Sequence, residues 1–139
     1  MAYCTQVDIL EQIPEIELVQ LSDDANAGVV DESVVTRGIA DADAEIDGYC
    51  GNYYSVPFTP VPELVRKLSV DIAVYNLYSR RQGAPEGRKE RYDAAIQFLG
   101  RVADGKAVLP NNTMPESVFD GVLLSGPARV FSRETLRGF

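Results

Sequence analysis

The stretch PELVRKLSVDIAVYNLYSRR, residues 62–81, decides the fold because it predicts a helix that is apolar on most of its circumference. Pro62 suits the first turn of a helix, where its missing N–H is not needed. Apolar side chains follow on two adjoining lines, one with Leu64, Leu68, Ile72 and Tyr75 and the other with Val70, Val74, Leu77 and Tyr78. A helix that is apolar nearly all round is usually the buried centre of its domain. We therefore expect the other helices to pack around residues 62–81.

A second long helix is expected before it, beginning after Asp31, whose side chain suits a helix N-cap. Its apolar residues recur every three to four positions, at Val35, Ile39, Ala42, Ile46, Tyr49 and Tyr53. Pro57, Pro60 and Pro62 then forbid a continuing helix. The two long helices should therefore be joined by an extended corner at residues 53–62.

Shorter segments complete an all-α prediction. Thr5 can cap a short helix that reaches about residue 12, and Pro14 can begin another that reaches about residue 20. A last helix is expected over residues 86–104, with Gly105 as its stop. The first two helices are predicted to direct inward Ile9, Leu10, Ile13, Ile16, Val19 and Leu21. We predict a small helical bundle over residues 1–105, with further helices around two long central ones, and a C-terminal arm over residues 106–139.

The predicted arm is too apolar for an ordinary disordered tail, and glycine and proline interrupt it too often for another bundle helix. Three arginines lie four residues apart, so a short helix would align them on one face. Fully extended, residues 111–139 span roughly 95 Å. We predict that the arm becomes ordered on a partner through Arg129, Phe131, Arg133, Leu136, Arg137 and Phe139. The alternative is that the segment folds back on its own bundle.

Charge divides the chain in two. Residues 1–63 contain 13 acidic residues and one basic residue, whereas residues 64–139 contain 12 basic and eight acidic residues. Such asymmetry fits pairing within the chain, or like subunits that pack an acidic face on a basic one. The net charge of −8 argues against sequence-specific binding to nucleic acid. No apolar run approaches the ~20 residues that span a bilayer, so no membrane contact is expected.

Four acidic residues of the second long helix are predicted to form a subunit interface: Asp41, Asp43, Glu45 and Asp47. In this interpretation a basic surface of a partner covers them, whereas in the simpler one they are solvated. A hypothesis of another class makes them the ligands of a metal-binding protein or the acid–base groups of an enzyme. That hypothesis requires the carboxylates to converge, but residues two apart on a helix point to very different sides.

Histidine is absent, which removes Ser-His and Cys-His nucleophile pairs and histidine metal ligands. The chain also has no Gly-rich phosphate loop, no Cys-x-x-Cys pair and no nucleophile elbow. Cys4 and Cys50 have no metal-like spacing and are interpreted as reduced thiols of a cytosolic setting. We expect a protein that is not an enzyme and that needs no cofactor.

The stretch SDDANAGVVD, residues 22–31, superficially resembles a calcium loop. If Asp23 is the first ligand, the third and fifth positions hold Ala25 and Ala27, whose side chains have no oxygen. The twelfth position holds Val34 where a bidentate glutamate is needed. A tight loop with Gly28 at positive φ is therefore the favoured interpretation.

Several stretches together are similar to one family of phage proteins. They are MAYCTQVD at residues 1–8, IADADAEIDGY at 39–49, YSVPF at 54–58, LSVDIAVY at 68–75, RYDAAI at 91–96 and RVFSRETLRGF at 129–139. Their order and spacing resemble the small structural protein that Mu-like tailed phages encode among their head and neck genes. The resemblance covers nearly the whole chain.

This resemblance implies a subunit of the phage neck, the head–tail connector or adaptor, located in the virion and assembled in the host cytoplasm. It implies a homo-oligomeric ring that docks on the portal protein and contacts adjacent neck or tail proteins. A dodecamer is expected because the portals of such phages are twelvefold. A stopper or tail-terminator protein of the neck is the alternative within the same class.

Overall fold

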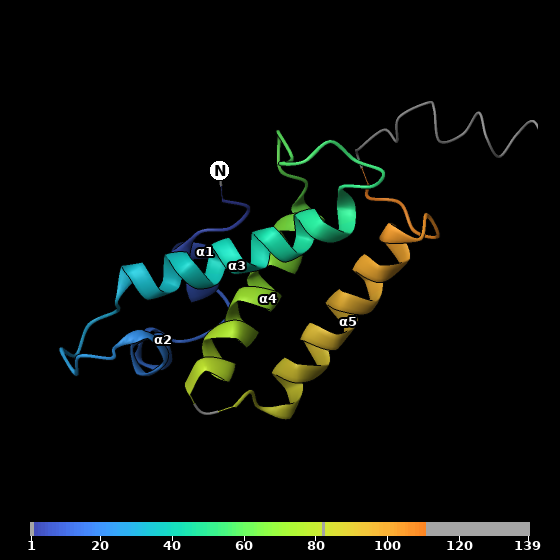
Figure 1. Ribbon diagram of the computed structural model, residues 1–139. Helices are drawn as coiled ribbons and strands as arrows, with labels where there is room; N and C mark the ends of the chain where they lie inside the picture. The colour runs from blue at the N-terminus through green and yellow to red at the C-terminus, as the bar shows by residue number, and fades with distance from the viewer. Residues whose placement is uncertain (1, 82, 111–139) are drawn as a thin grey trace, which may run out of the picture.

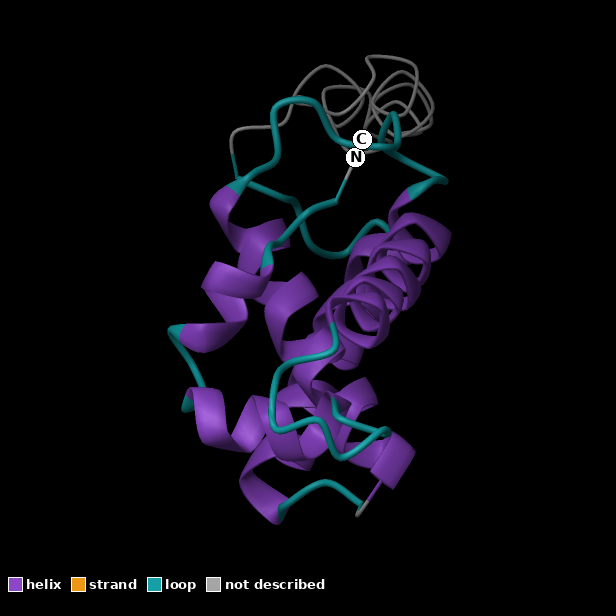
Figure 2. Cartoon of the chain, turned by 90° about the vertical axis from the view of Figure 1, so that its left-hand side faces the viewer, coloured by secondary structure: helices purple, strands orange, loops and turns teal. Residues whose placement is uncertain are grey.

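The computed structural model describes residues 2–81 and 83–110, and all regular secondary structure within them is helical. Five helices follow in order: α1 (Gln6–Leu10), α2 (Glu15–Ser22), α3 (Glu32–Cys50), α4 (Glu63–Arg81) and α5 (Glu86–Ala103). Helix α4 runs through the middle of the bundle, α3 crosses it, and α5 returns alongside it (Figure 1). The side view in Figure 2 likewise shows helices joined by loops in the described chain. The prediction of an all-α bundle is confirmed.

Helix α4 is the centre of the core because it contacts each of the other four helices. Its buried residues are Val65, Leu68, Ser69, Val70, Ile72, Ala73, Val74, Leu77 and Tyr78. They include most members of the two apolar lines, which confirms the prediction of a helix buried on most of its circumference. Tyr75, which is half-buried, stacks on Tyr92 of α5 with the ring centroids 3.9 Å apart.

Helix α3 begins where its cap predicts, since the Asp31 side chain accepts a hydrogen bond from the Ser33 amide at 3.0 Å. A Cβ atom added at Gly38 would lie 3.3 Å from Cδ2 of Leu77 on α4. Glycine at this position therefore lets α3 approach α4 closely. Around Gly48, nearer the end of the same helix, an added Cβ atom would meet nothing within 4 Å.

One inward prediction in the short helices is wrong. The side chain of Ile16 is 74% exposed, and Leu18 is fully buried in its place. Helix α2 buries Leu18, Leu21 and Ser22, which share one face at spacings of three and four residues. Two residues turn a helix by about 200°, so Ile16 faces away from Leu18.

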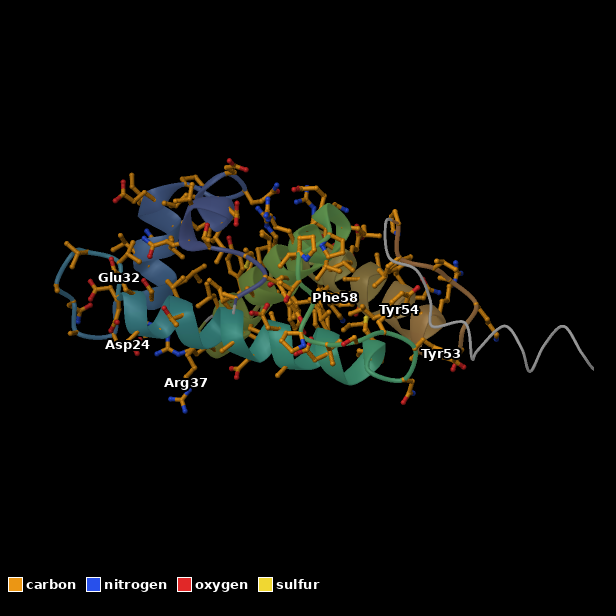
Figure 3. The ribbon with its side chains drawn as sticks, turned by 90° about the horizontal axis from the view of Figure 1, so that it is seen from above. Asp24, Glu32, Arg37, Tyr53, Tyr54 and Phe58 are labelled. Atoms are coloured by element: carbon orange, nitrogen blue, oxygen red, sulfur yellow. The ribbon has the colours of Figure 1, made fainter. Side chains whose placement is uncertain are left out.

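Between α3 and α4 the chain leaves the helix at the predicted corner, but residues 53–62 run through turns and bends rather than an extended stretch, and the peptide bonds before Pro57 and Pro60 are cis. Tyr54 and Phe58 of this corner point into the bundle (Figure 3). After α5, Leu109 is fully buried, and its amide donates a hydrogen bond to the Tyr54 hydroxyl at 3.0 Å. The chain therefore stays on the bundle through residue 109. Residues 111–139, most of the predicted arm, lie outside the described residues.

Within residues 2–81 and 83–110, none of the helices is long and apolar enough to cross a membrane.

We predict that Gly38→Leu lowers the free energy of unfolding by about 1–3 kcal/mol, because the new side chain must displace Leu77 in a packed core. Gly48→Leu is the matched control, the same exchange on the same helix with open space around it. It should leave stability unchanged or raise it, because leucine favours helix more than glycine does. Urea unfolding measures both, and equal effects of the two exchanges would contradict the proposed close contact.

Candidate functional site

The structure does not bring the four predicted interface carboxylates together on one face. Asp41 is exposed, and the carboxylate of Glu45 accepts a hydrogen bond from the Tyr92 hydroxyl of α5 at 3.0 Å. Asp43 and Asp47, four residues apart, both face the N-terminal segment of the chain. The acidic helix therefore divides its carboxylates among three surroundings, and only Asp43 and Asp47 form a pair on one side.

Tyr3 attaches the N-terminal segment to α3. Its amide donates to Oδ2 of Asp43 at 3.0 Å, and its hydroxyl donates to Oδ1 of Asp47. The same hydroxyl accepts a hydrogen bond from the Phe58 amide at 3.1 Å, and the two rings pack with their centroids 5.7 Å apart. Burial and the hydrogen bond to Asp47 raise the pKa of Tyr3 well above its ordinary value. The phenol therefore stays protonated and acts as the donor to Asp47.

Ser69 extends this arrangement to the central helix. Its hydroxyl lies 2.8 Å from Oδ1 of Asp43 and 3.2 Å from Sγ of Cys4. A serine hydroxyl carries one proton, and the carboxylate is the stronger acceptor, so Ser69 donates to Asp43 and the Cys4 thiol donates to Ser69. The polar chain Cys4–Ser69–Asp43–Tyr3–Asp47 thus joins the N-terminal segment, α3 and α4.

The surroundings of this polar chain decide the chemistry of its members. Burial raises the pKa of the Cys4 thiol to about 11, and burial also raises that of Cys50 to about 11. Both cysteines are free and buried, and thiols of this kind react poorly because the thiolate is the nucleophile. Burial raises the pKa of Asp43 as well, although the hydrogen bonds from Ser69 and Tyr3 oppose that shift. These properties suit a structural network better than a nucleophile and its base.

A groove of about 570 Å³ lies between the N-terminal segment and α3. The groove is lined by Ala2, Cys4, Thr5, Gln6, Val35, Thr36, Ile39, Ala40, Asp43, Ala44, Asp47 and Pro57. Most of these side chains are small or apolar, and Asp43 and Asp47 are the charged ones. We call it the α3 groove.

A second hollow, of about 420 Å³, lies among α1, α4 and α5 and has charges of both signs. Arg66, Lys67 and Arg91 face it together with acidic residues that include Asp71. Burial raises the pKa of Asp71, against the opposing effect of the nearby cations. Because this hollow is lined by groups of both signs, it does not favour a ligand of one charge.

The loop that resembles a calcium site is closed by its own hydrogen bonds. The Asp23 carboxylate accepts from the amides of Ala27 and Gly28 at 2.9 and 2.7 Å. Gly28 has a φ of 77°, which confirms the predicted tight loop with positive φ. Within residues 2–81 and 83–110, no group of three or more Asp, Glu, Cys or His side chains could hold a metal ion.

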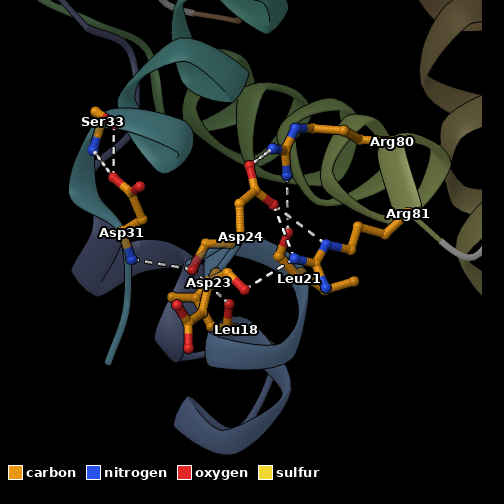
Figure 4. Close-up of polar contacts among 9 residues, drawn as sticks. Leu18, Leu21, Asp23, Asp24, Asp31, Ser33, Arg80 and Arg81 are labelled. Carbon is orange, nitrogen blue, oxygen red and sulfur yellow. Dashed lines mark hydrogen bonds and ion pairs between the residues drawn. The ribbon is translucent and has the colours of Figure 1, made fainter. Parts of the chain in front are cut away.

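Two arginines at the end of α4 contact the other carboxylate of this loop. Asp24 forms ion pairs with Arg80 and, at 2.9 Å, with Arg81 (Figure 4). These hydrogen bonds lower the pKa of Asp24. Acidic residues of the first half of the chain are therefore partly paired with basic residues of the second half. Arg37 of α3 points away from the bundle (Figure 3).

Sequence reasoning singled out neither Tyr3 nor Ser69 as functional, although Ser69 interrupts an otherwise apolar helix face. That interruption was the available signal, because a polar residue on a buried face needs a partner. The predicted partner-binding residues of the arm are Arg129, Phe131, Arg133, Leu136, Arg137 and Phe139, and all of them lie outside the described residues.

The fold and the attached N-terminal segment define a small all-helical protein, and the comparisons with known proteins then identify its family. Residues 3–120 match the family described as bacteriophage Mu, Gp36, and the chain belongs to this family. It is 28% identical over 139 residues to the Mu-like prophage FluMu protein gp36 of Haemophilus influenzae, covering 99% of this chain and 97% of that one. It is 30% identical over 107 residues to gene product J of Escherichia phage Mu, covering 76% and 74% of the two chains. The chain is therefore a protein of a Mu-like phage or prophage.

We predict that Tyr3→Phe lowers the free energy of unfolding by about 1–3 kcal/mol. The exchange leaves the Phe58 amide and the Asp47 carboxylate without their hydroxyl partner in buried surroundings. Tyr53→Phe is the matched control, because the structure records no hydrogen bond of the half-buried Tyr53 hydroxyl within the described residues. Urea unfolding tests this, and a loss no larger than that of the control would show that the Tyr3 hydroxyl has no structural role.

Asp24→Asn should lower the unfolding midpoint at pH 7, modestly because the ion pairs are exposed. Since the pKa of Asp24 is lowered in the folded state, its contribution is present above about pH 4 and is lost as the pH falls through that lowered pKa. The difference between wild type and variant should therefore disappear in strong acid, as thermal unfolding at several pH values would show. Asp93→Asn, an exposed carboxylate without an ion pair in the described part of the chain, is the control. A difference that persists in acid would contradict the assignment.

Proposed function

We propose that this protein is a structural subunit of the phage neck, the head–tail connector or adaptor. In this role it forms a ring, expected to be a dodecamer, that docks on the portal protein and links it to adjacent neck or tail proteins. It acts by binding alone, without catalysis or a cofactor. It resides in the virion neck and is assembled in the host cytoplasm.

The observation that carries this proposal is membership of the Mu Gp36 family over residues 3–120, together with the resemblance to neck proteins drawn from the sequence motifs. A protein of this kind needs a rigid body and surfaces that differ from one side to the other, because each subunit in a ring presents one surface and receives another. The described body meets the first need, since α4 is buried among four other helices.

The distribution of charge supports the second need. Asp41 is exposed on α3, and Asp43 and Asp47 line the α3 groove. Helix α5, elsewhere in the bundle, exposes Arg101 but also the acidic Glu86, Glu90 and Asp93. The surfaces of α3 and α5 therefore differ in charge, as the two surfaces of a subunit in a head-to-tail contact do.

The anchoring of Leu109 supports a docking role for the residues that follow it. Because Leu109 is buried and bonded to Tyr54, the 29 residues after position 110 begin from a fixed point of the bundle. Those residues are rich in apolar side chains, and their three arginines lie in the last 11 positions. A long segment also adds contact area that a 15.2 kDa body has in short supply.

We predict that the full chain sediments with the portal of the same phage, whereas a chain ending at residue 110 does not. The shortened chain keeps Leu109, so circular dichroism should show an unchanged helical bundle. A full chain with Arg129, Arg133 and Arg137 changed to Glu is the control for charge and should bind at least tenfold more weakly than wild type. Equal binding by all three chains would move the contact to the helical body. Failure of the intact chain to bind would contradict the adaptor role and favour a stopper or tail terminator.

A further inference from the structure

The α3 groove is open to a partner of limited size. Its volume of about 570 Å³ lies within the range of about 300–1,000 Å³ that ligand clefts occupy. Ala40 and Ala44, one helical turn apart, are both exposed in it, and Ala2 and Pro57 are exposed on its other side. These short side chains allow another chain to approach the α3 backbone closely. The groove therefore suits a peptide segment with a few large side chains.

The two carboxylates of the groove favour a cationic occupant. Asp43 accepts hydrogen bonds from Ser69 and Tyr3, and Asp47 accepts one at Oδ1 from Tyr3. Neither of them forms an ion pair within residues 2–81 and 83–110, where the acidic members of such pairs are Asp24 and Glu63. A carboxylate offers about four lone-pair positions, so both residues retain acceptor capacity. Half-buried carboxylates that retain acceptor capacity are stabilised when a further cation is brought to them.

The C-terminal sequence ARVFSRETLRGF, residues 128–139, has the composition that this groove would recognise. It holds three arginines and one glutamate, in a chain whose net charge is −8. Its arginines are Arg129, Arg133 and Arg137. Phe131 and Leu136 lie between those arginines and supply large apolar side chains. An occupant with arginine and aromatic anchors is the kind that dominates binding energy at protein interfaces.

A row of packed aromatic side chains links the point from which this sequence departs to the groove. Leu109 bonds to Tyr54, the Tyr54 ring packs on Phe58 with centroids 6.0 Å apart, and Phe58 packs on Tyr3 beside the groove. Figure 1 shows the N-terminal segment beside the middle of α3 and the chain after α5 to its right, both toward the upper side of the bundle. Subunits that meet on this side in a ring would bring the departure point of one copy near the groove of the next.

We propose that the α3 groove of each subunit receives residues 128–139 of a neighbouring copy, which supply arginines to its two carboxylates and large apolar side chains to its alanines. This inference rests on the ring of the proposed function. The acidic groove and the basic segment are two different surfaces of one chain, so their contact is head-to-tail, as a closed ring requires. Exchange of the segment also adds interface area to each contact.

Disulfide trapping between two full-length variants tests the proposal. One variant carries Ala44→Cys and the other Leu136→Cys, and they are mixed, oxidised and resolved by size, both alone and on the portal. Cys4 and Cys50 are 1% and 0% exposed, so the native thiols take little part in the oxidation. We expect a mixed dimer at a yield at least tenfold above that of a control pair in which Ala94→Cys replaces Ala44→Cys. Ala94 is an exposed alanine on α5 and does not line the α3 groove, so the exchange is matched.

A second experiment distinguishes binding of the segment to a neighbouring copy from binding within the same chain. A double variant with both new cysteines should form linked chains of increasing size. A monomer closed by an internal disulfide would instead overturn the proposal in favour of a segment that folds back. Equal yields with Ala44→Cys and Ala94→Cys, or no mixed dimer with or without portal, would overturn it as well. Mixing Leu136→Cys with the wild-type chain controls for capture by Cys4.

The charge complementarity has its own readout. Arg133→Glu in the Leu136→Cys chain should reduce the trapped dimer at least tenfold, whereas Lys89→Glu, an exposed basic residue of α5, should leave it unchanged. Equal effects of the two exchanges would overturn the assigned charge contact. Sedimentation with the portal is measured on the cysteine variants that keep all three arginines. Portal binding by these chains without trapping would refute the groove contact and leave the adaptor role standing, whereas absence of both would count against the proposed function itself.

Discussion

The burial of α4 on nearly all sides is the constraint on which the rest of the structure depends. One neighbouring helix covers one face, so a helix that is apolar on most of its circumference needs several neighbours. Helices α3 and α5 cover most of α4, and the short helices α1 and α2 also pack against it. Gly38 allows α3 to come close at Leu77, so the largest contact of the bundle depends on a missing side chain. The position of every other described helix follows from this requirement.

The polar groups within this core are linked rather than scattered. Ser69 is buried on the central helix and donates to Asp43, and Asp43 in turn accepts the amide of Tyr3. Buried polar groups are costly unless each finds a partner, and linked groups favour one arrangement over its alternatives. The network therefore orients the N-terminal segment on α3 and α4. It also creates one wall of the α3 groove, because Cys4 and Thr5 follow Tyr3 directly.

Some charged side chains are paired within the chain, and others line a surface that remains open to a partner. Arg80 and Arg81 form ion pairs with Asp24, and the Tyr92 hydroxyl donates a hydrogen bond to Glu45. Asp43 and Asp47 are different, because they combine hydrogen bonds within the chain with acceptor capacity toward a groove. Membership of the Mu Gp36 family makes the chain a phage structural or morphogenesis protein, and the proposed subunit contact uses these two carboxylates.

The long helices, their caps and the corner between them could be read from the sequence because they depend on local features. Apolar spacing, the cap at Asp31 and three prolines act within a few residues of where they stand, and so does the need for positive φ at Gly28. The same reasoning failed for Ile16 and treated the acidic residues of α3 as one set. Whether a side chain is buried, or which partner a carboxylate accepts, depends on elements far away in the chain. Tyr3 meets Asp43, Asp47 and Phe58 at separations of 40 to 55 residues, and no local pattern encodes such contacts. The candidate groove therefore emerged only when the packed helices placed the N-terminal segment on α3.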